Sequence, residues 1–379
     1  MKLPPFKLDL WLAAHEFATP PIRFNLASST GPAWTLAEIA ALGGGDVRAF
    51  DEVKLSYAPP AGGKLLRERL AAREGVDAER VLVMTGASEV LLTLCCHLAA
   101  PGASLLVPKP VYPALPAMAR AWGLNVREYA LDPARGFAQE ADAVLAQVDA
   151  TTRAVFVNTP HNPTGSIMTA TEQRKLATAL AARDVLMIVD EVYHPLYFGA
   201  ASSNIGTPGA ARLLQDFPNV VVLGDFAKAL SLPGLRLGWL VDRDAVRREA
   251  LLDLRSYFSI SSSPLCEAIG AHALAHSASI LGRLEAVARA NLALLSAFME
   301  MHGGLFAFPA PAGGTTCFPC LRDGRDARPL AERLAKAGVL VAPGDCFDMP
   351  SHLRIGFGAQ REGYAAALDV FSEVISDWR

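Results

Sequence analysis

The sequence predicts an α/β protein: a large domain with a mostly parallel mixed sheet, and a smaller C-terminal α/β domain. Between about residues 80 and 241, short runs rich in Val, Leu and Ile alternate with helical stretches, which is typical of a parallel sheet covered by helices. After Pro264 a long Ala/Leu-rich helical stretch is followed by a shorter αβ segment. We expect an N-terminal arm and part of the small domain over residues 1–45, the large domain over 46–270 and the small domain over 271–379.

Six buried strands are expected where apolar residues run without alternation. They are Val81–Met84, Ser104–Val107, Ala154–Asn158, Val185–Val189, Val220–Leu223 and Arg236–Val241. Helices are expected between them, for example over Glu89–Ala99 and Ala170–Arg183. One continuous helix is expected over Leu265–His302, followed by strands over Val339–Ala342 and His352–Phe357.

The composition limits the class of protein. Of the 379 residues 51% are hydrophobic and 19% charged, which excludes extended disorder. The formal charge is −3 and no basic run is present, so we expect neither nucleic acid nor a membrane surface as a partner. The six irregularly spaced cysteines favour a reducing compartment, and the N-terminal segment, broken by Pro4 and Pro5, lacks the apolar stretch of a signal peptide. A cytoplasmic protein is therefore expected.

Two patterns suggest a metal site, but we expect none. Cys317 and Cys320 have CxxC spacing without a second pair. His272 and His276 lie four apart on a helical stretch, without the Glu of HExxH or a third ligand nearby. Packed or solvated side chains explain both pairs better.

Polar residues follow four of the predicted strands, where an open parallel sheet binds its ligands. Gly86 permits a tight turn after the first strand, and the helix that follows presents free N–H groups, which suits a phosphate. The next loops carry Asn162, then Asp190 with Tyr193, then Lys228. The sequence therefore predicts one polar site at this edge of the sheet.

In these motifs the chain resembles the class I/II aminotransferases, pyridoxal-phosphate enzymes of fold type I. The resemblance depends on HNPTG, DEVY, the lysine of FAK, PGLRLGW and LRIGFG, which follow one another with family-like spacing over nearly the whole chain. It implies the cofactor pyridoxal 5′-phosphate. It also implies a homodimeric enzyme that moves an amino group between an amino acid and a 2-oxo acid.

The resemblance assigns catalytic roles to matching positions. Lys228 is similar to the lysine that forms the Schiff base with the cofactor and then carries a proton. Asp190 matches the carboxylate that keeps the pyridine nitrogen protonated. Tyr193 and Asn162 match the groups that hydrogen-bond the ring 3-oxygen, and Tyr112 matches the aromatic residue stacked on the ring.

The resemblance also implies how the cofactor phosphate is held. Arg236, eight residues after Lys228, matches the arginine that pairs with the phosphate. Ala87 and Ser88 would add backbone N–H groups, and Ser88 a hydroxyl. Tyr57 matches the tyrosine that reaches the phosphate of the neighbouring subunit, so the active site would need a dimer.

For the substrate, the resemblance implies that Arg354 grips the α-carboxylate. Asn162 would lie beside the same group, and Gly31 would leave room near the substrate. One position departs from the family: Asp225 stands where a phosphate-binding serine is usual, three residues before Lys228. Since a carboxylate repels a phosphate, we expect either that Asp225 turns toward a cation such as Arg236 or that the phosphate depends more on Ser88 and Tyr57.

Two other functions stay open from the sequence. The arm segment Phe6–Trp11 and the segments Gly313–Thr316 and Val341–Phe347 are similar to capreomycidine synthase-like enzymes, which eliminate and cyclise an arginine-derived substrate. A pyridoxal-phosphate lyase, cyclase or β-eliminating enzyme is therefore the alternative. A cofactor-binding sensor attached to a DNA-binding module is disfavoured, because the motifs begin within the first sixty residues.

Overall fold

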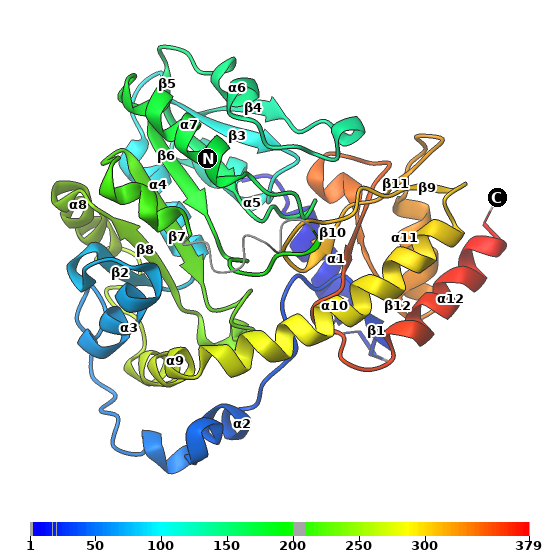
Figure 1. Ribbon diagram of the computed structural model, residues 1–379, viewed down its shortest axis with the longest axis horizontal. Coiled ribbons are helices and arrows are strands. Elements are labelled where there is room, and N and C mark those ends of the chain that lie inside the picture. Colours follow the sequence, from blue (N-terminus) through cyan, green and yellow to red (C-terminus); the bar gives the residue numbers. More distant parts are fainter. Residues whose placement is uncertain (1–2, 17, 20, 200–208, 379) are drawn as a thin grey trace.

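A seven-stranded sheet lies at the centre of the computed structural model, which describes residues 3–16, 18–19, 21–199 and 209–378 (Figure 1). Its strand order is β2-β8-β7-β6-β5-β3-β4. The strands are β2 (Val81–Met84), β3 (Ser104–Lys109), β4 (Asn125–Ala130), β5 (Thr152–Asn158), β6 (Leu186–Asp190), β7 (Val220–Asp225) and β8 (Gly238–Asp242). Paired strands are parallel except that β8 runs antiparallel to both β2 and β7. The predicted α/β fold with a mostly parallel sheet is confirmed.

The reversed direction of β8 brings its first residue to the edge where its neighbours end. Gly238 pairs with Asp225, the last residue of β7, and with Met84, the last residue of β2. The residues just before β8 therefore lie at the same edge as those just after β2 and β7. This explains how Arg236, which precedes a strand, lies at the same edge of the sheet as Asp190 and Lys228, which lie at or after strand ends.

Helices cover both faces of this sheet (Figure 1). Over the whole described chain, including the C-terminal part, the helices are α1 (Lys7–Glu16), α2 (Leu36–Ala40), α3 (Lys64–Glu74), α4 (Ala87–Leu98), α5 (Ala114–Ala121), α6 (Ala141–Leu145), α7 (Ala170–Ala181), α8 (Ala245–Arg255), α9 (Pro264–Ala275), α10 (Ser277–Met301), α11 (Arg328–Lys336) and α12 (Tyr364–Ser376). Strand β2 shows the two faces, because Leu82 and Met84 join the core cluster under α4, α5 and α8, whereas Val81 and Val83 join the cluster that includes α7. Burial on both faces accounts for the unbroken apolar runs in the sequence.

Three small sheets form the C-terminal part, beside α10, α11 and α12 (Figure 1). Their strands are β1 (Phe24–Asn25) with β12 (Val339–Leu340), β10 (Thr316–Cys317) with β14 (Leu353–Gly356) and β13 (Ala342–Pro343), and β9 (Phe306–Ala307) with β11 (Cys320–Leu321). Because β1 pairs with β12, the N-terminal arm packs on this part of the chain. The domain boundaries at residues 45 and 270 stay predictions.

One expectation about a single element is wrong, and one strand of the central sheet was missed. The helix expected over Leu265–His302 is two helices, because His276 has non-helical dihedral angles (φ −117°, ψ 22°) between α9 and α10. Its ring packs against that of His272, with centroids 4.8 Å apart. Strand β4 was not expected, since it is an edge strand with several exposed polar residues rather than an apolar run.

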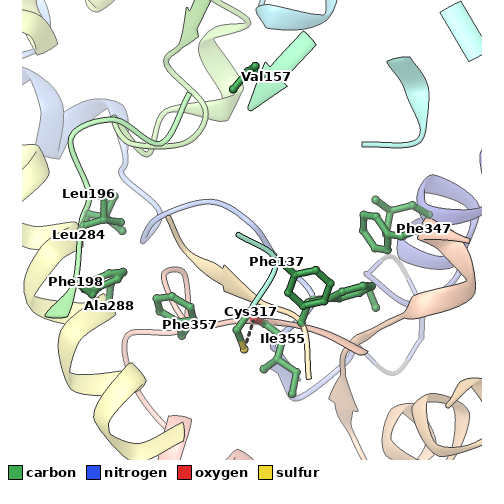
Figure 2. Packing of buried hydrophobic residues seen from close by; sticks show 14 of the residues in the cluster. Phe137, Val157, Leu196, Phe198, Leu284, Ala288, Cys317, Phe347, Ile355 and Phe357 are labelled. Atoms are coloured by element: carbon green, nitrogen blue, oxygen red, sulfur yellow. Dashed lines mark hydrogen bonds between the residues drawn. The ribbon is translucent and has the colours of Figure 1, made fainter. Parts of the chain in front are cut away.

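The larger core cluster continues from the central sheet into the small sheets (Figure 2). Val157 of β5 belongs to it, as do Phe357 and Ile355 near the C-terminal end. Ile355 accepts a hydrogen bond through its carbonyl from Cys317 Sγ, at 3.6 Å. Helices long and apolar enough to cross a bilayer do not occur in the described part of the chain.

Candidate active site

A cavity of about 240 Å³ lies at the edge of the sheet where β5, β6 and β7 end. Its lining includes most of the site residues expected from the sequence, namely Ala87, Ser88, Tyr112, Asn162, Asp190, Tyr193, Lys228, Arg236 and Arg354. Helix α1 of the arm adds Leu8, Asp9 and Leu12 to the lining. The cavity therefore draws on the large sheet, the arm and strand β14 together.

The phosphate cradle expected after β2 is a glycine turn at the start of α4. Gly86 has φ +79° and is the residue before the helix. A β-carbon at Gly86 would lie only 2.8 Å from Nη2 of Arg236, so a side chain there would push the guanidinium away from this turn, and the positive φ itself favours glycine. Arg236 donates from Nη1 to the carbonyl of Pro233 at 3.2 Å. A cation and a helix N-terminus thus meet at one point, which suits an anion.

Asp225 occupies part of the same cradle. Its Oδ2 accepts a hydrogen bond from the backbone N–H of Ala87 at 2.7 Å, and its Oδ1 accepts from the N–H of Ala227. Burial raises the pKa of Asp225, while these two amides and the nearby Lys228 and Arg236 act in the opposite direction. The hydrogen bonds of this carboxylate in the described structure thus come from backbone amides and not from Arg236, the first of the two alternatives expected from the sequence.

Lys228 is a partly buried amine between two carboxylates. Its Nζ lies 2.9 Å from Oγ of Ser29. Burial lowers the pKa of Lys228 to about 8, although Asp225 and Asp190 favour the charged form. The neutral, nucleophilic amine is therefore accessible near neutral pH.

Asp190 is the last residue of strand β6, and few neighbouring groups stabilise the negative charge of its carboxylate. Its Oδ1 accepts from the N–H of Val192 at 3.1 Å. Burial raises the pKa of Asp190 to about 7, and the neighbouring Asp225 adds to this effect. A cationic nitrogen bound in the cavity would stabilise the charged carboxylate.

Two side chains of this site offer groups to the interior of the cavity. The hydroxyl of Tyr193 is buried and makes no hydrogen bond of good geometry among the described residues. Burial raises the pKa of Tyr193 to about 12, and the side chains of Ser29 and Thr315 lie near enough to act in the opposite direction. The ring of Tyr112 meets Phe6 of the arm edge-on, with centroids 5.7 Å apart. A buried donor without a partner is costly, so Tyr193 is suited to a bound oxygen acceptor.

Arg354 on β14 is a buried guanidinium with no carboxylate partner among the described residues. Only 2% of it is exposed. Its Nη2 donates to the carbonyl of Ala27 at 2.8 Å and its Nη1 to Oδ1 of Asn162 at 3.2 Å, while its Nε has no partner in the described part. Asn162 is fixed in turn, since its N–H donates to Oδ1 of Asn158 at 2.7 Å. A buried cation of this kind calls for an anionic ligand.

Three predicted site residues are not part of the cavity lining: Gly86, which directly precedes Ala87 of the lining, Tyr57 and Gly31. Tyr57 is 81% exposed and borders a surface cleft formed with residues 261–264. Gly31 packs against Ser231, whose side chain would collide with any β-carbon at position 31. The predicted roles of Tyr57 and Gly31, for the partner's phosphate and for the substrate, stay predictions.

Ser29 and Asn158 line the cavity and were not identified from the sequence. Asn158 is the last residue of β5 and pairs in register with Asp190. Its position at the end of a predicted strand could therefore have identified it as a site residue. Ser29 follows no predicted strand or motif. Only the folding of the arm against β14 brings Ser29 to the cavity.

Comparison with known proteins gives one consistent result. The family model for aminotransferase class I and II matches residues 26–371. A capreomycidine synthase from Streptomyces vinaceus is 32% identical over 98% of this chain and 94% of the relative, and a histidinol-phosphate aminotransferase from Rhodospirillum centenum is 32% identical over 88% and 87%. Among solved structures, the pyridoxal-phosphate-dependent cyclase OrfR superimposes with a TM-score of 0.84 at 28% identity, covering 100% of this chain and 99% of the other.

Proposed function

Because the chain belongs to the class I and II aminotransferase family and depends on pyridoxal 5′-phosphate, we propose that it moves an amino group between an amino acid and a 2-oxo acid. The main support for this proposal is the pair of residues that share the cavity. Lys228, a nucleophilic amine, shares one cavity with Arg354, a buried guanidinium suited to an α-carboxylate.

The residues of the cavity fit the cofactor. Arg236 and the glycine turn at Gly86 suit its phosphate, and the unpartnered hydroxyl of Tyr193 suits its ring oxygen. Asp190, whose carboxylate is buried with a raised pKa, suits its ring nitrogen. When bound, the cofactor supplies an electron-accepting ring for the electrons of the substrate α-carbon.

The chain's own residues divide the remaining work. Lys228 binds the cofactor and moves a proton at its Nζ, since a pKa of about 8 lets the amine both accept and release a proton near neutral pH. Arg354 and Asn162 orient the substrate carboxylate, since their side chains meet at 3.2 Å on one wall of the cavity. Helix α1 lines the same cavity through the apolar side chains of Leu8 and Leu12, which limit access of water.

A homodimer is part of this proposal. Tyr57 and Leu55 are 81% and 82% exposed, and Tyr257 is 87% exposed. Large apolar side chains at a surface favour a protein interface. Because Tyr57 does not line the cavity of its own chain, its exposure supports the expectation that it serves the cavity of the partner subunit.

A cyclase or lyase with the same cofactor is the second candidate. The capreomycidine synthase from Streptomyces vinaceus aligns with 98% of this chain, and the cyclase OrfR covers all of it. Both reactions would begin with the same Lys228-assisted removal of a proton from the α-carbon, after which only the fate of the electron pair differs.

Dependence on an amino acceptor separates the two candidates. The purified protein with pyridoxal 5′-phosphate is incubated with single amino acids, with and without a 2-oxo acid, and the products are followed by mass spectrometry. Turnover that requires the 2-oxo acid and yields a new amino acid supports the aminotransferase. Release of ammonia or a cyclised product without any 2-oxo acid would contradict it and favour the alternative.

A further inference from the structure

The arm segment Ala27–Ser29 contacts two charged residues of the site at once. The hydroxyl of Ser29 lies 2.9 Å from Nζ of Lys228, and two residues earlier the carbonyl of Ala27 accepts from Nη2 of Arg354 at 2.8 Å. The carbonyl of Ser29 is itself fixed, because Thr315 donates to it from Oγ1 at 2.8 Å. The segment therefore places a hydroxyl against the amine of Lys228 from the side that carries Arg354.

The neighbouring serine shows that this contact is specific. Ser28 satisfies its hydroxyl locally, at 2.9 Å from Oγ1 of Thr30, and does not line the cavity. Ser29, one residue later, lines the cavity and contacts Lys228, from which it is separated by 199 positions in the sequence. A serine that only needed a hydrogen-bond partner could find one within the segment, as Ser28 does.

We propose that Ser29 is a positioning residue whose hydroxyl holds the free amine of Lys228 in the cavity, on the side where Arg354 binds the substrate carboxylate. This inference depends on the proposed function, in which the amine of Lys228 alternates between a bound and a free state. The hydroxyl contacts the amine only while the amine is free, so it acts in the states where Lys228 must attack a carbon or carry a proton. Ser29 is not assigned a catalytic step of its own.

The expected effect on titration follows from the groups that face Lys228. These are the carboxylates of Asp190 and Asp225 and the guanidinium groups of Arg236 and Arg354, and they are unchanged when Ser29 is replaced. The hydroxyl interacts more strongly with the ammonium form than with the neutral amine, because hydrogen bonds to charged groups are the stronger ones. Removing it should therefore lower the pKa of Lys228, by up to about one pH unit.

The test measures the amine directly in the cofactor-free, full-length chain. Wild type and the variants Ser29→Ala, Ser29→Thr and Ser28→Ala are labelled with trace acetic anhydride between about pH 6 and pH 10, and acetylation of Lys228 is quantified by peptide mass spectrometry. We expect a lower midpoint in Ser29→Ala and a wild-type midpoint in Ser29→Thr, which keeps the hydroxyl, and in Ser28→Ala. An unchanged midpoint in Ser29→Ala, or an equal shift in Ser28→Ala, would overturn the proposal.

Two additions keep the test decisive. If circular dichroism shows that Ser29→Ala is not folded, Ser29→Cys replaces it and should shift the midpoint in the same direction. Adding pyridoxal 5′-phosphate to each protein then separates this inference from the proposed function. A wild-type chain without the visible absorbance of lysine-bound cofactor contradicts the proposed function, whereas the labelling midpoints decide the role of Ser29 in either case.

Discussion

The carboxylate of Asp225 and the backbone N–H of Ala87 form a hydrogen bond of 2.7 Å at the start of helix α4. In the proposed site this N–H would be one of the donors to the cofactor phosphate, so Asp225 and the phosphate would compete for the same group. Most of the carboxylate is buried, and repulsion between it and a phosphate is weakly screened.

Replacing Asp225 by Ser should strengthen cofactor binding, by about tenfold, because it removes a negative charge from the cradle and restores the hydroxyl usual at this position. The measurement is a fluorescence titration of the cofactor-free chain with pyridoxal 5′-phosphate. Asp225→Asn keeps an acceptor for Ala87 without the charge and separates the two effects. Weaker binding in both variants would mean that the carboxylate supports the phosphate site instead of opposing it.

Replacing Lys228 by Ala should abolish turnover and the visible absorbance of lysine-bound cofactor, because no other amine lines the described cavity. Absorbance spectra of the purified protein check this. Lys175→Ala is a matched control, since Lys175 lies at the surface in an ion pair with Asp142. An unchanged spectrum in Lys228→Ala would refute the assignment.

Asp190 should make the cofactor-free chain less stable as pH rises. Its pKa is about 7 in the folded chain, above the ordinary 3.8, so the folded state holds a proton that the unfolded state loses first. Stability is therefore lost as pH rises from about 4 to 7. Asp190→Asn has no such proton to lose. Its free energy of unfolding should therefore fall by roughly 1–3 kcal/mol less than that of wild type between pH 4 and pH 7.

Urea unfolding of the cofactor-free proteins at the two pH values measures this difference. Asp142→Asn, at an exposed position, controls for the amide substitution. Equal pH dependence in wild type and Asp190→Asn would show that Asp190 is not the responsible group.

Arg354→Gln should raise KM for amino acids by about 100-fold, because it removes the buried cation that would bind the α-carboxylate. Steady-state kinetics with an amino acid and with the corresponding amine, which lacks the carboxylate, measure the effect. We expect wild type to prefer the amino acid over the amine, and Arg354→Gln to lose this preference. Arg174→Gln, in a surface ion pair with Asp216, should behave as wild type. A retained preference for the carboxylate in Arg354→Gln would contradict this role.

Mixed dimers test whether Tyr57 serves the partner's cavity. If it does, Lys228→Ala chains, which are inactive alone, and Tyr57→Ala chains, which are weakly active alone, should form hybrids with one intact site and recover about one quarter of wild-type activity. The chains are mixed, briefly unfolded, refolded and assayed. Lys228→Ala mixed with Asp190→Ala is the control and should recover nothing, because both side chains line the cavity of one chain. Failure of the first pair to recover activity would place Tyr57 outside the site.

The sequence predicted the parts of the site that depend on strand order. Asn162, Asp190 and Lys228 follow apolar runs, and parallel strands with burial on both faces produce such runs and align their ends. Family-like motifs added Arg236 and Arg354. The edge strand β4 could not be predicted in this way, because exposure removes the apolar signal.

The contribution of the arm was not predictable from local pattern. Ser29 reaches Lys228 only because β1 pairs with β12 and the following residues lie along β14. Such contacts join segments hundreds of residues apart, and no local periodicity records them. The break at His276 also involves a distant segment, since the His276 ring, which packs against that of His272, lies close to Gly43.

The direction of β8 also limits how this chain can change in length. Because β8 is antiparallel to β7, no crossover helix is needed between them, and one short connection carries both Lys228 and Arg236. An insertion there would separate the amine of Lys228 from Arg236, the cation proposed to bind the phosphate. The connection between the parallel strands β5 and β6 runs instead through helix α7. Extra residues inserted after Ala181, before β6 begins, would lie at the opposite edge of the sheet and leave the cavity undisturbed. Inserted loops or grafted peptides should therefore be tolerated best at the edge of the sheet opposite the cavity.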